Sequence, residues 1–189
     1  MRQKVDQTVL WNEAAKAGFF FGAVSVGCLA LKEWAAASGS AFLAQAALIV
    51  LWPAEFFGCI LLMKKCMLDL RDKYDDVRME HTRSLGRRAA LLSGLLLASA
   101  QALFIMQLPA ESLETLLDSL VGGMQLGTAE REQLEGLLPS LPLYSFIFQW
   151  LYCWLYGSLL ASFMSRYIFL QKLFSSLPPR EEKETPDEQ

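Results

Sequence analysis

The chain has 189 residues, of which 53% are hydrophobic and 20% charged, and its mean hydropathy is +0.28. A chain this apolar is not an ordinary soluble domain, and its length suits one membrane domain without a separate soluble one. The formal net charge is only −3, and the basic residues are confined to particular segments. We therefore expect the lipid bilayer, and no nucleic acid, as a partner.

Four apolar segments are long enough to cross a bilayer, since about 20 helical residues span a hydrocarbon core of about 30 Å. They predict membrane spans over residues 14–36, 41–63, 89–108 and 143–170. The turn at 38–40 is so short that the first two spans must form an antiparallel hairpin. The sequence thus predicts an all-α fold, an integral-membrane antiparallel four-helix bundle over residues 1–174.

The distribution of Lys and Arg predicts how the spans are oriented. Of the 17 basic residues, only Lys32, at the outer end of the first span, and Arg131, in the connection after the third, lie on the other side. Because basic loops stay in the cytoplasm, both termini are predicted to be cytoplasmic. Ala35 to Ser38 are similar to a signal-peptidase site, but charges ahead of the first apolar run favour a retained helix over a removed signal peptide.

The remaining segments carry their own patterns. The charged connection after the second span predicts that this helix extends into solvent, followed by a break in the helix at Gly86. The external loop 109–142 holds two amphipathic patterns, over residues 113–121 and 128–138, which predict short helices on the outer membrane surface or on the mouth of the bundle. Residues 175–189, rich in Pro, Glu and Lys, predict a disordered cytoplasmic tail.

Small residues recur at four-residue spacing in two spans and predict where helices pack, because small side chains let backbones approach closely in a membrane. These candidate packing residues are Gly18, Gly22, Ala90, Gly94, Ala98 and Ala102. The sequence leaves open whether they meet each other or a second subunit. The aromatic run 146–156 of the fourth span is expected either to pack against these stripes or to line a binding cavity.

Glu55 is the sharpest functional candidate, because it is an ionisable residue about 12 Å inside the second span by helix rise. A carboxyl group at such a depth costs about 2.5–3.5 kcal/mol on insertion scales, so it should face protein or water. The neighbouring Pro53 cannot donate a backbone hydrogen bond and is expected to kink the helix. Candidate partners at a comparable depth are Ser93, Ser99, Tyr156 and Ser158, with Lys16 or Arg88 reaching inward from the cytoplasmic side.

Glu55 has two interpretations: a hydrogen-bonded lock between helices, or a site that handles protons or cations. Few other residues indicate chemistry. Cys28, Cys59 and Cys153 lie within spans, where thiols behave as small apolar groups. A single histidine and the lack of a calcium-loop pattern predict no metal and no cofactor. No nucleophile with a base and no paired acids stand out, so we expect no enzymatic activity.

Three segments together resemble a known family. They are Trp11–Gly18 before the first span, Arg83–Arg87 before the third, and Thr128–Glu135 in the external loop. The chain resembles, from about residue 10 to 172, a four-span domain-of-unknown-function family widespread in Bacteroidota. This resemblance implies a bacterial inner (cytoplasmic) membrane protein without an established activity, and it transfers no functional residues.

Two functions follow as hypotheses. The first is a non-enzymatic membrane protein that acts as an accessory subunit or scaffold, through helix–helix and loop contacts with a membrane protein partner or in a homo-oligomer. The small-residue stripes and the amphipathic loop favour it. The alternative is a small oligomeric transporter or channel that uses Glu55 in a proton or cation path.

Overall fold

Four long helices make up most of the chain described by the computed structural model, which covers residues 6–74, 77–109 and 136–175, with side chains as far as Leu170. They are α1 (Gln7–Ala37), α2 (Ala41–Lys73), α3 (Met79–Gln107) and α6 (Leu141–Ser175), with a 3-10 turn η1 (Leu138–Ser140) leading into α6. Each is long and apolar enough to cross a membrane. The predicted all-α, four-helix membrane architecture is confirmed, and it is that of a multi-pass membrane protein.

Several predicted boundaries differ from the observed ones. α2 continues beyond the predicted span to Lys73, in line with the solvated extension expected there. The predicted break at Gly86 is wrong, because α3 already begins at Met79 and Gly86 lies buried inside it. A Cβ atom on Gly86 would lie 2.5 Å from the Cβ of Ala161 in α6, so this glycine permits a close helix contact. Both predicted helices of the external loop, apart from the end of the second at residues 136–138, and the tail from residue 176 lie outside the described residues.

Local chemistry explains where the first hairpin begins and turns. The carboxylate of Asp6 accepts a hydrogen bond from the backbone N–H of Gln7, which caps α1. Ser40 caps α2 by accepting a hydrogen bond from the N–H of Leu43. Between the two helices, Gly39 has a φ of 72°, a left-handed conformation that side chains disfavour. The turn therefore reverses the chain within three residues, as the sequence predicts.

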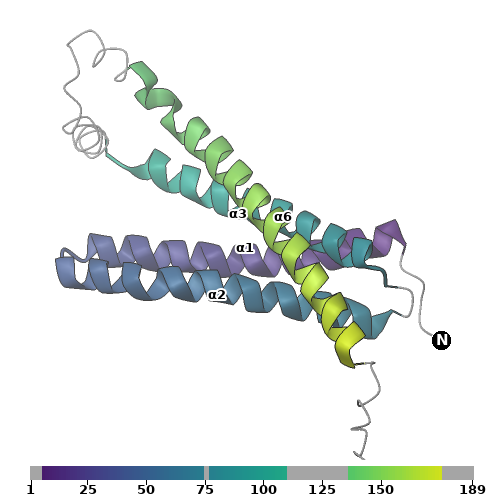
Figure 1. Ribbon diagram of the computed structural model, residues 1–189. Coiled ribbons are helices and arrows are strands. Elements are labelled where there is room, and N and C mark those ends of the chain that lie inside the picture. Colours follow the sequence, from purple (N-terminus) through teal and green to yellow (C-terminus); the bar gives the residue numbers. More distant parts are fainter. Residues whose placement is uncertain (1–5, 75–76, 110–135, 176–189) are drawn as a thin grey trace, which may run out of the picture.

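The helices form two antiparallel pairs that diverge at one end (Figure 1). α3 is central, since it packs along both α1 and α6, whereas α2 packs mainly on α1 and touches α3 and α6 only sparsely. One end of the bundle, at which α1 turns into α2 and α3 finishes, is named the open end. The opposite end, where α1 and α3 begin and α2 and α6 finish, is the charged end. In Figure 1 the α1–α2 hairpin and the α3–α6 pair separate toward the open end.

Small residues form the two helix seams. In the α1–α3 seam, a Cβ on Gly18 would lie 2.8 Å from the Cβ of Leu92 and 2.9 Å from the carbonyl oxygen of Ala89. In the α3–α6 seam, a Cβ on Gly94 would lie 2.8 Å from the Cβ of Cys153. Both stripes therefore pack within one chain but not on each other: the α1 stripe lies against Ala89 and Leu92 of α3, whereas the α3 stripe at Gly94 lies against α6. Side chains this small allow the backbones to come so close.

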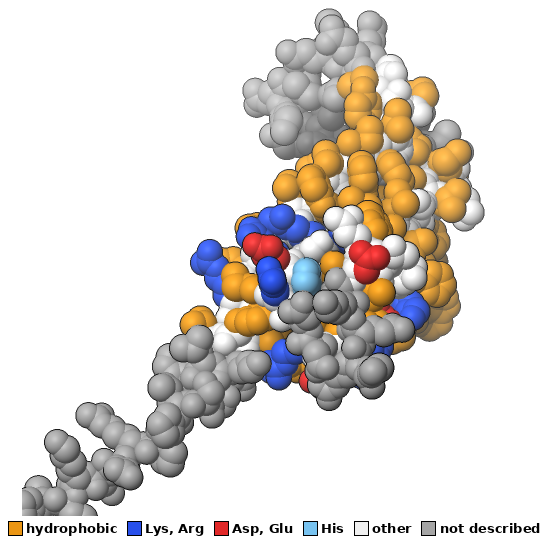
Figure 2. Space-filling model, turned by 90° about the vertical axis from the view of Figure 1, so that its right-hand side faces the viewer, with side chains coloured by type: hydrophobic (Ala, Val, Ile, Leu, Met, Phe, Trp, Pro, Cys, Tyr) orange, Lys and Arg blue, Asp and Glu red, His pale blue; other side chains and the backbone are white. Residues whose placement is uncertain are grey.

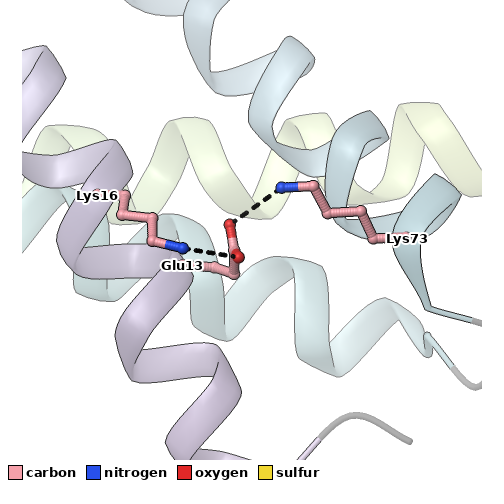
Figure 3. Close-up of polar contacts among 3 residues, drawn as sticks. All are labelled: Glu13, Lys16 and Lys73. Atoms are coloured by element: carbon pink, nitrogen blue, oxygen red, sulfur yellow. Dashed lines mark hydrogen bonds and ion pairs between the residues drawn. The ribbon is translucent and has the colours of Figure 1, made fainter. Parts of the chain in front are cut away.

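The packed core lies in the half of the bundle nearer the charged end. Its larger cluster consists of Ala17, Phe21, Met63, Met67, Ala89, Ala161 and Ile168. Charged side chains gather at this end of the molecule, with apolar side chains covering the helices beyond them (Figure 2). Glu13 of α1 pairs there with Lys16 at 3.3 Å and with Lys73 of α2 at 3.5 Å, so it ties the two helices together (Figure 3).

Candidate functional site: an intramembrane cavity

A cavity of about 370 Å³ lies where the two helix pairs begin to separate. All four long helices contribute to its wall, so it is a product of the tertiary fold and of no single segment. The volume is at the lower end of the range of about 300–1,000 Å³ for pockets that bind small molecules. Its lining combines apolar and aromatic side chains with a small number of polar groups, which is the composition of a binding site.

Lys32 and Glu55 form an ion pair in the cavity wall, with 2.7 Å between Lys32 Nζ and Glu55 Oε2. Their side chains are only 22% and 23% exposed. In a helix each Cα–Cβ bond tilts toward the N-terminus. Because α1 and α2 are antiparallel, Lys32 leans inward from the open end and Glu55 leans outward from the middle of the bundle. The two side chains thus lean toward each other along the hairpin.

The predicted partners of Glu55 are wrong, since its partner is Lys32. Lys32 lies at the outer end of the first span and is counted with the external side in the sequence, whereas in the structure its side chain reaches inward to Glu55. Of the expected partners on the cytoplasmic side, Lys16 pairs with Glu13. Arg88 lies over the ring of Trp11, 4.6 Å from its centroid.

The other predicted site residues fall into different places. Ser93 lines the cavity but donates its hydroxyl to the carbonyl of Ala90 in its own helix, and Ser99 donates to the carbonyl of Leu95. Ser158 is half-buried, and its hydroxyl oxygen is buried without a hydrogen-bond partner within the described residues. Of these residues, the fold brings only Ser93 and Tyr156 into the same wall as Glu55.

Pro53 lies inside α2, which runs on through it as one helix from Ala41 to Lys73. Trp52, directly before it, and Glu55, two residues after it, line the cavity, whereas Pro53 itself does not. Of the packing candidates, Ala90 and Gly94 also line the wall, Ala98 is fully buried and Ala102 is half-buried. On α1, Gly22 lies in the seam against the side chain of Leu96.

Aromatic rings form a series of contacts on α2 and α6 that crosses from one helix to the other at Phe56 and Tyr156. The ring centroids of Trp52 and Phe56 lie 6.0 Å apart, those of Phe56 and Tyr156 6.0 Å, and those of Tyr156 and Tyr152 6.2 Å. Trp150 faces α3 instead, where its indole N–H donates to the carbonyl of Leu91 at 3.3 Å. The aromatic run of the fourth span therefore serves both expected purposes, packing on one face and cavity lining on another.

Comparisons with protein-family models, with curated proteins and with solved structures found no match. The resemblance to the four-span family therefore stays a prediction, and the cavity has to be interpreted from its own chemistry. Its lining adds two side-chain amides, Gln101 and Gln149, that the sequence analysis missed. The available signal was a polar amide inside an otherwise apolar span. Among the described residues, no group of three or more His, Cys, Asp or Glu side chains is arranged to hold a metal ion.

Proposed function

We propose that this chain is a non-enzymatic membrane protein that acts by binding a small molecule in the cavity between its two helix pairs. The observation that carries this proposal is the Lys32–Glu55 ion pair in the cavity wall. Charged side chains inside a membrane are costly and commonly mark a functional pathway or binding site. If the pair served only to join α1 to α2, it would not need to lie in the wall of a cavity that α3 and α6 also line.

The ion pair favours binding over conduction. In the alternative of a proton or cation path, Glu55 would have to offer a free carboxylate to the passing ion. Here that carboxylate is paired with an ammonium group at 2.7 Å. An arriving cation would have to displace Lys32, whose own charge repels it. A neutral pair bordering apolar walls is better suited to a ligand that carries both polar and apolar parts.

The charge distribution supports an orientation for this site. Basic side chains concentrate in the segments at the charged end of the bundle, which agrees with both termini being cytoplasmic. The cavity would then face the external side of a bacterial inner membrane, as the family resemblance implies. A ligand would reach it from the outer solution or from the outer leaflet.

Cysteine labelling from outside the cell tests this proposal. In a variant with its four cysteines changed to Ala, we expect Gln101→Cys, at the cavity wall, to react with a membrane-impermeant maleimide in intact spheroplasts. Leu103→Cys is the matched control: Leu103 lies two residues further along α3 and is 58% exposed, but it does not line this cavity. On the lipid-facing surface the control thiol should stay unreactive. Equal labelling of both positions, or of neither, would contradict a cavity open to external water.

A specific observation favours a second candidate, the accessory subunit or scaffold. α2 buries only Met63, Met67 and Leu70, all toward the charged end, and its remaining surface is largely uncovered by the described helices. A partner helix or a second copy of the chain would find that surface free. Gentle extraction into native nanodiscs followed by particle-mass determination tests this candidate. A stoichiometric partner or a defined homo-oligomer would support it, whereas a monomer surrounded by lipid would contradict it.

A further inference from the structure

The proposed binding function can be extended to a class of ligand. We propose that the cavity binds a zwitterionic lipid, with the head between Lys32 and Glu55 and one acyl chain directed toward the charged end. The lipid enters sideways, between α2 and α6. This inference rests on the proposed function, and four features of the cavity support it: its gradient of polarity, its pair of opposite charges, its aromatic border and its size.

Polar side chains line the cavity from its outer part to just above its floor. Lys32, Gln101 and Gln149 lie about 8–12 Å from the open ends of their helices by helix rise. By the same measure Glu55 and Ser93 lie at about 21 Å, and Phe21, Ala90 and Leu160 form the floor at about 24–28 Å. The cavity therefore carries polar groups as deep as Glu55 and ends on an apolar floor. A lipid of the outer leaflet has the matching order, with its head outward and its chain toward the membrane centre.

The two charges select a head that carries both signs. A purely anionic head would pair with Lys32 and leave Glu55 as an unpaired carboxylate in the membrane. A purely cationic head would pair with Glu55 and strand the ammonium group of Lys32. A zwitterionic head supplies a cation for Glu55 and an anion for Lys32, so that both charges stay paired. The ion pair therefore favours a zwitterionic head over a singly charged one, because a singly charged head would leave either Lys32 or Glu55 unpaired.

The border between α2 and α6 provides a route from the bilayer. The rings of Phe56 and Tyr156 meet across it, as described above. One helical turn closer to the open end, Trp52 and Tyr152 are 67% and 56% exposed and line the cavity from opposite sides. α2 and α6 make few other contacts with each other. The cavity is therefore bordered by lipid-facing aromatic side chains on the side toward the bilayer, and Phe56 and Tyr156 separate its floor from the surrounding lipid.

The size of the cavity restricts the ligand further. A volume of about 370 Å³ suits a molecule of drug size and not a large two-chain lipid in full. One chain and part of the head would enter, while a second chain would remain in the bilayer. A lysolipid, which has a single chain, is therefore the suitable soluble probe.

Native mass spectrometry of the protein in a non-ionic detergent tests the inference. The probes are lysophosphatidylethanolamine, which is zwitterionic, and lysophosphatidylglycerol, which is anionic, with the same acyl chain. We expect the zwitterionic probe to bind at least tenfold more tightly. The variant Lys32→Gln/Glu55→Gln should lose this preference. The control, Glu13→Gln/Lys16→Gln, removes the ion pairs of Glu13 with Lys16 and Lys73 at the charged end and should keep it.

A second variant keeps the test decisive if the neutralised pair does not fold. Leu97 lines the cavity, so Leu97→Trp should fill it and weaken binding of the zwitterionic probe at least tenfold, whereas Leu103→Trp should not. Equal affinity for both probes, or binding unchanged in Leu97→Trp, would overturn the inference. The lysolipids would then be bound only at the lipid-facing surface of the protein and not in the cavity. If Gln101→Cys is still labelled from outside in that case, the cavity remains a binding site for another ligand class. If Gln101→Cys is not labelled, the proposed function itself fails.

Discussion

At the scale of single residues, the Lys32–Glu55 pair is the feature on which the interpretation depends. Neither residue indicates the other in the sequence, because they lie in different helices and 23 positions apart. Their contact follows from the antiparallel hairpin and from the tilt of side chains toward the helix N-terminus. A charge that loses its partner in this cavity wall is only partly solvated, because about four-fifths of each side chain is covered, so the pair should be energetically coupled.

We expect single neutralisation of this pair to destabilise the protein by about 1–3 kcal/mol, less than for a fully buried pair because each side chain is about one-fifth exposed. The double variant Lys32→Met/Glu55→Gln should cost less than the sum of Lys32→Met and Glu55→Gln, since it leaves no charge unpaired. A double-mutant cycle from reversible unfolding in mixed micelles measures this coupling. A coupling energy below about 0.3 kcal/mol would indicate that both charges stay solvated when separated, and would contradict the expectation.

At the scale of helices, α3 organises the molecule because both of its seams are lined by small residues. Gly18 and Gly22 of α1 meet one side of α3, and Gly157 of α6 meets Ala90 on the other. Van der Waals contact of this kind is the main source of helix association in lipid, where apolar surface gains nothing by leaving the solvent. α2 has no comparable seam with α3 or α6 among the described residues, and it packs chiefly on α1.

A pair of glycine substitutions in α1 tests this account. Gly18→Leu should destabilise the bundle by about 1–3 kcal/mol or more. The Cβ of the new leucine would meet the backbone carbonyl of Ala89, which cannot move aside as the tip of a side chain can. Gly27→Leu is the matched control, since a Cβ there meets nothing within 4 Å. Thermal unfolding in detergent measures the difference. Equal melting temperatures for the two variants would mean that the α1–α3 seam contributes little to stability.

At the scale of the whole molecule, packing and charge both divide the bundle into two halves. The half near the charged end holds the core, the ion pairs of Glu13 and the ring contact of Arg88 with Trp11. In the half near the open end, the α1–α2 hairpin separates from the α3–α6 pair and the cavity lies at the point of separation (Figure 1). Such an arrangement would keep the proposed binding site accessible without weakening the packed half.

The orientation of these halves is itself a prediction. In a cysteine-free variant, Glu33→Cys on α1 near the open end should react with an impermeant maleimide in intact spheroplasts. Lys65→Cys, on α2 toward the charged end, should react only after the membrane is permeabilised. Both native side chains are exposed, so accessibility within the protein does not bias the comparison. The reverse pattern would place the cavity on the cytoplasmic side.

The sequence by itself determined the four helices, the short first turn and the small-residue stripes, because apolar length, Gly39 and four-residue spacing are local properties of the chain. It also singled out Glu55. It did not determine where the helices end, because a helix can continue outside the lipid through charged residues, as α3 does before Gly86.

Only the tertiary structure decided the partner of Glu55 and the existence of the cavity. Lys32, Gln101 and Gln149 come from three helices, and what they face depends on how each helix is rotated and where the pairs separate. Those rotations are set by the seams that α3 forms with α1 and α6, which are cooperative contacts between distant segments. Periodicity along a single helix gives the faces of that helix but not the helix that each face meets, so the site emerges only when the four are packed.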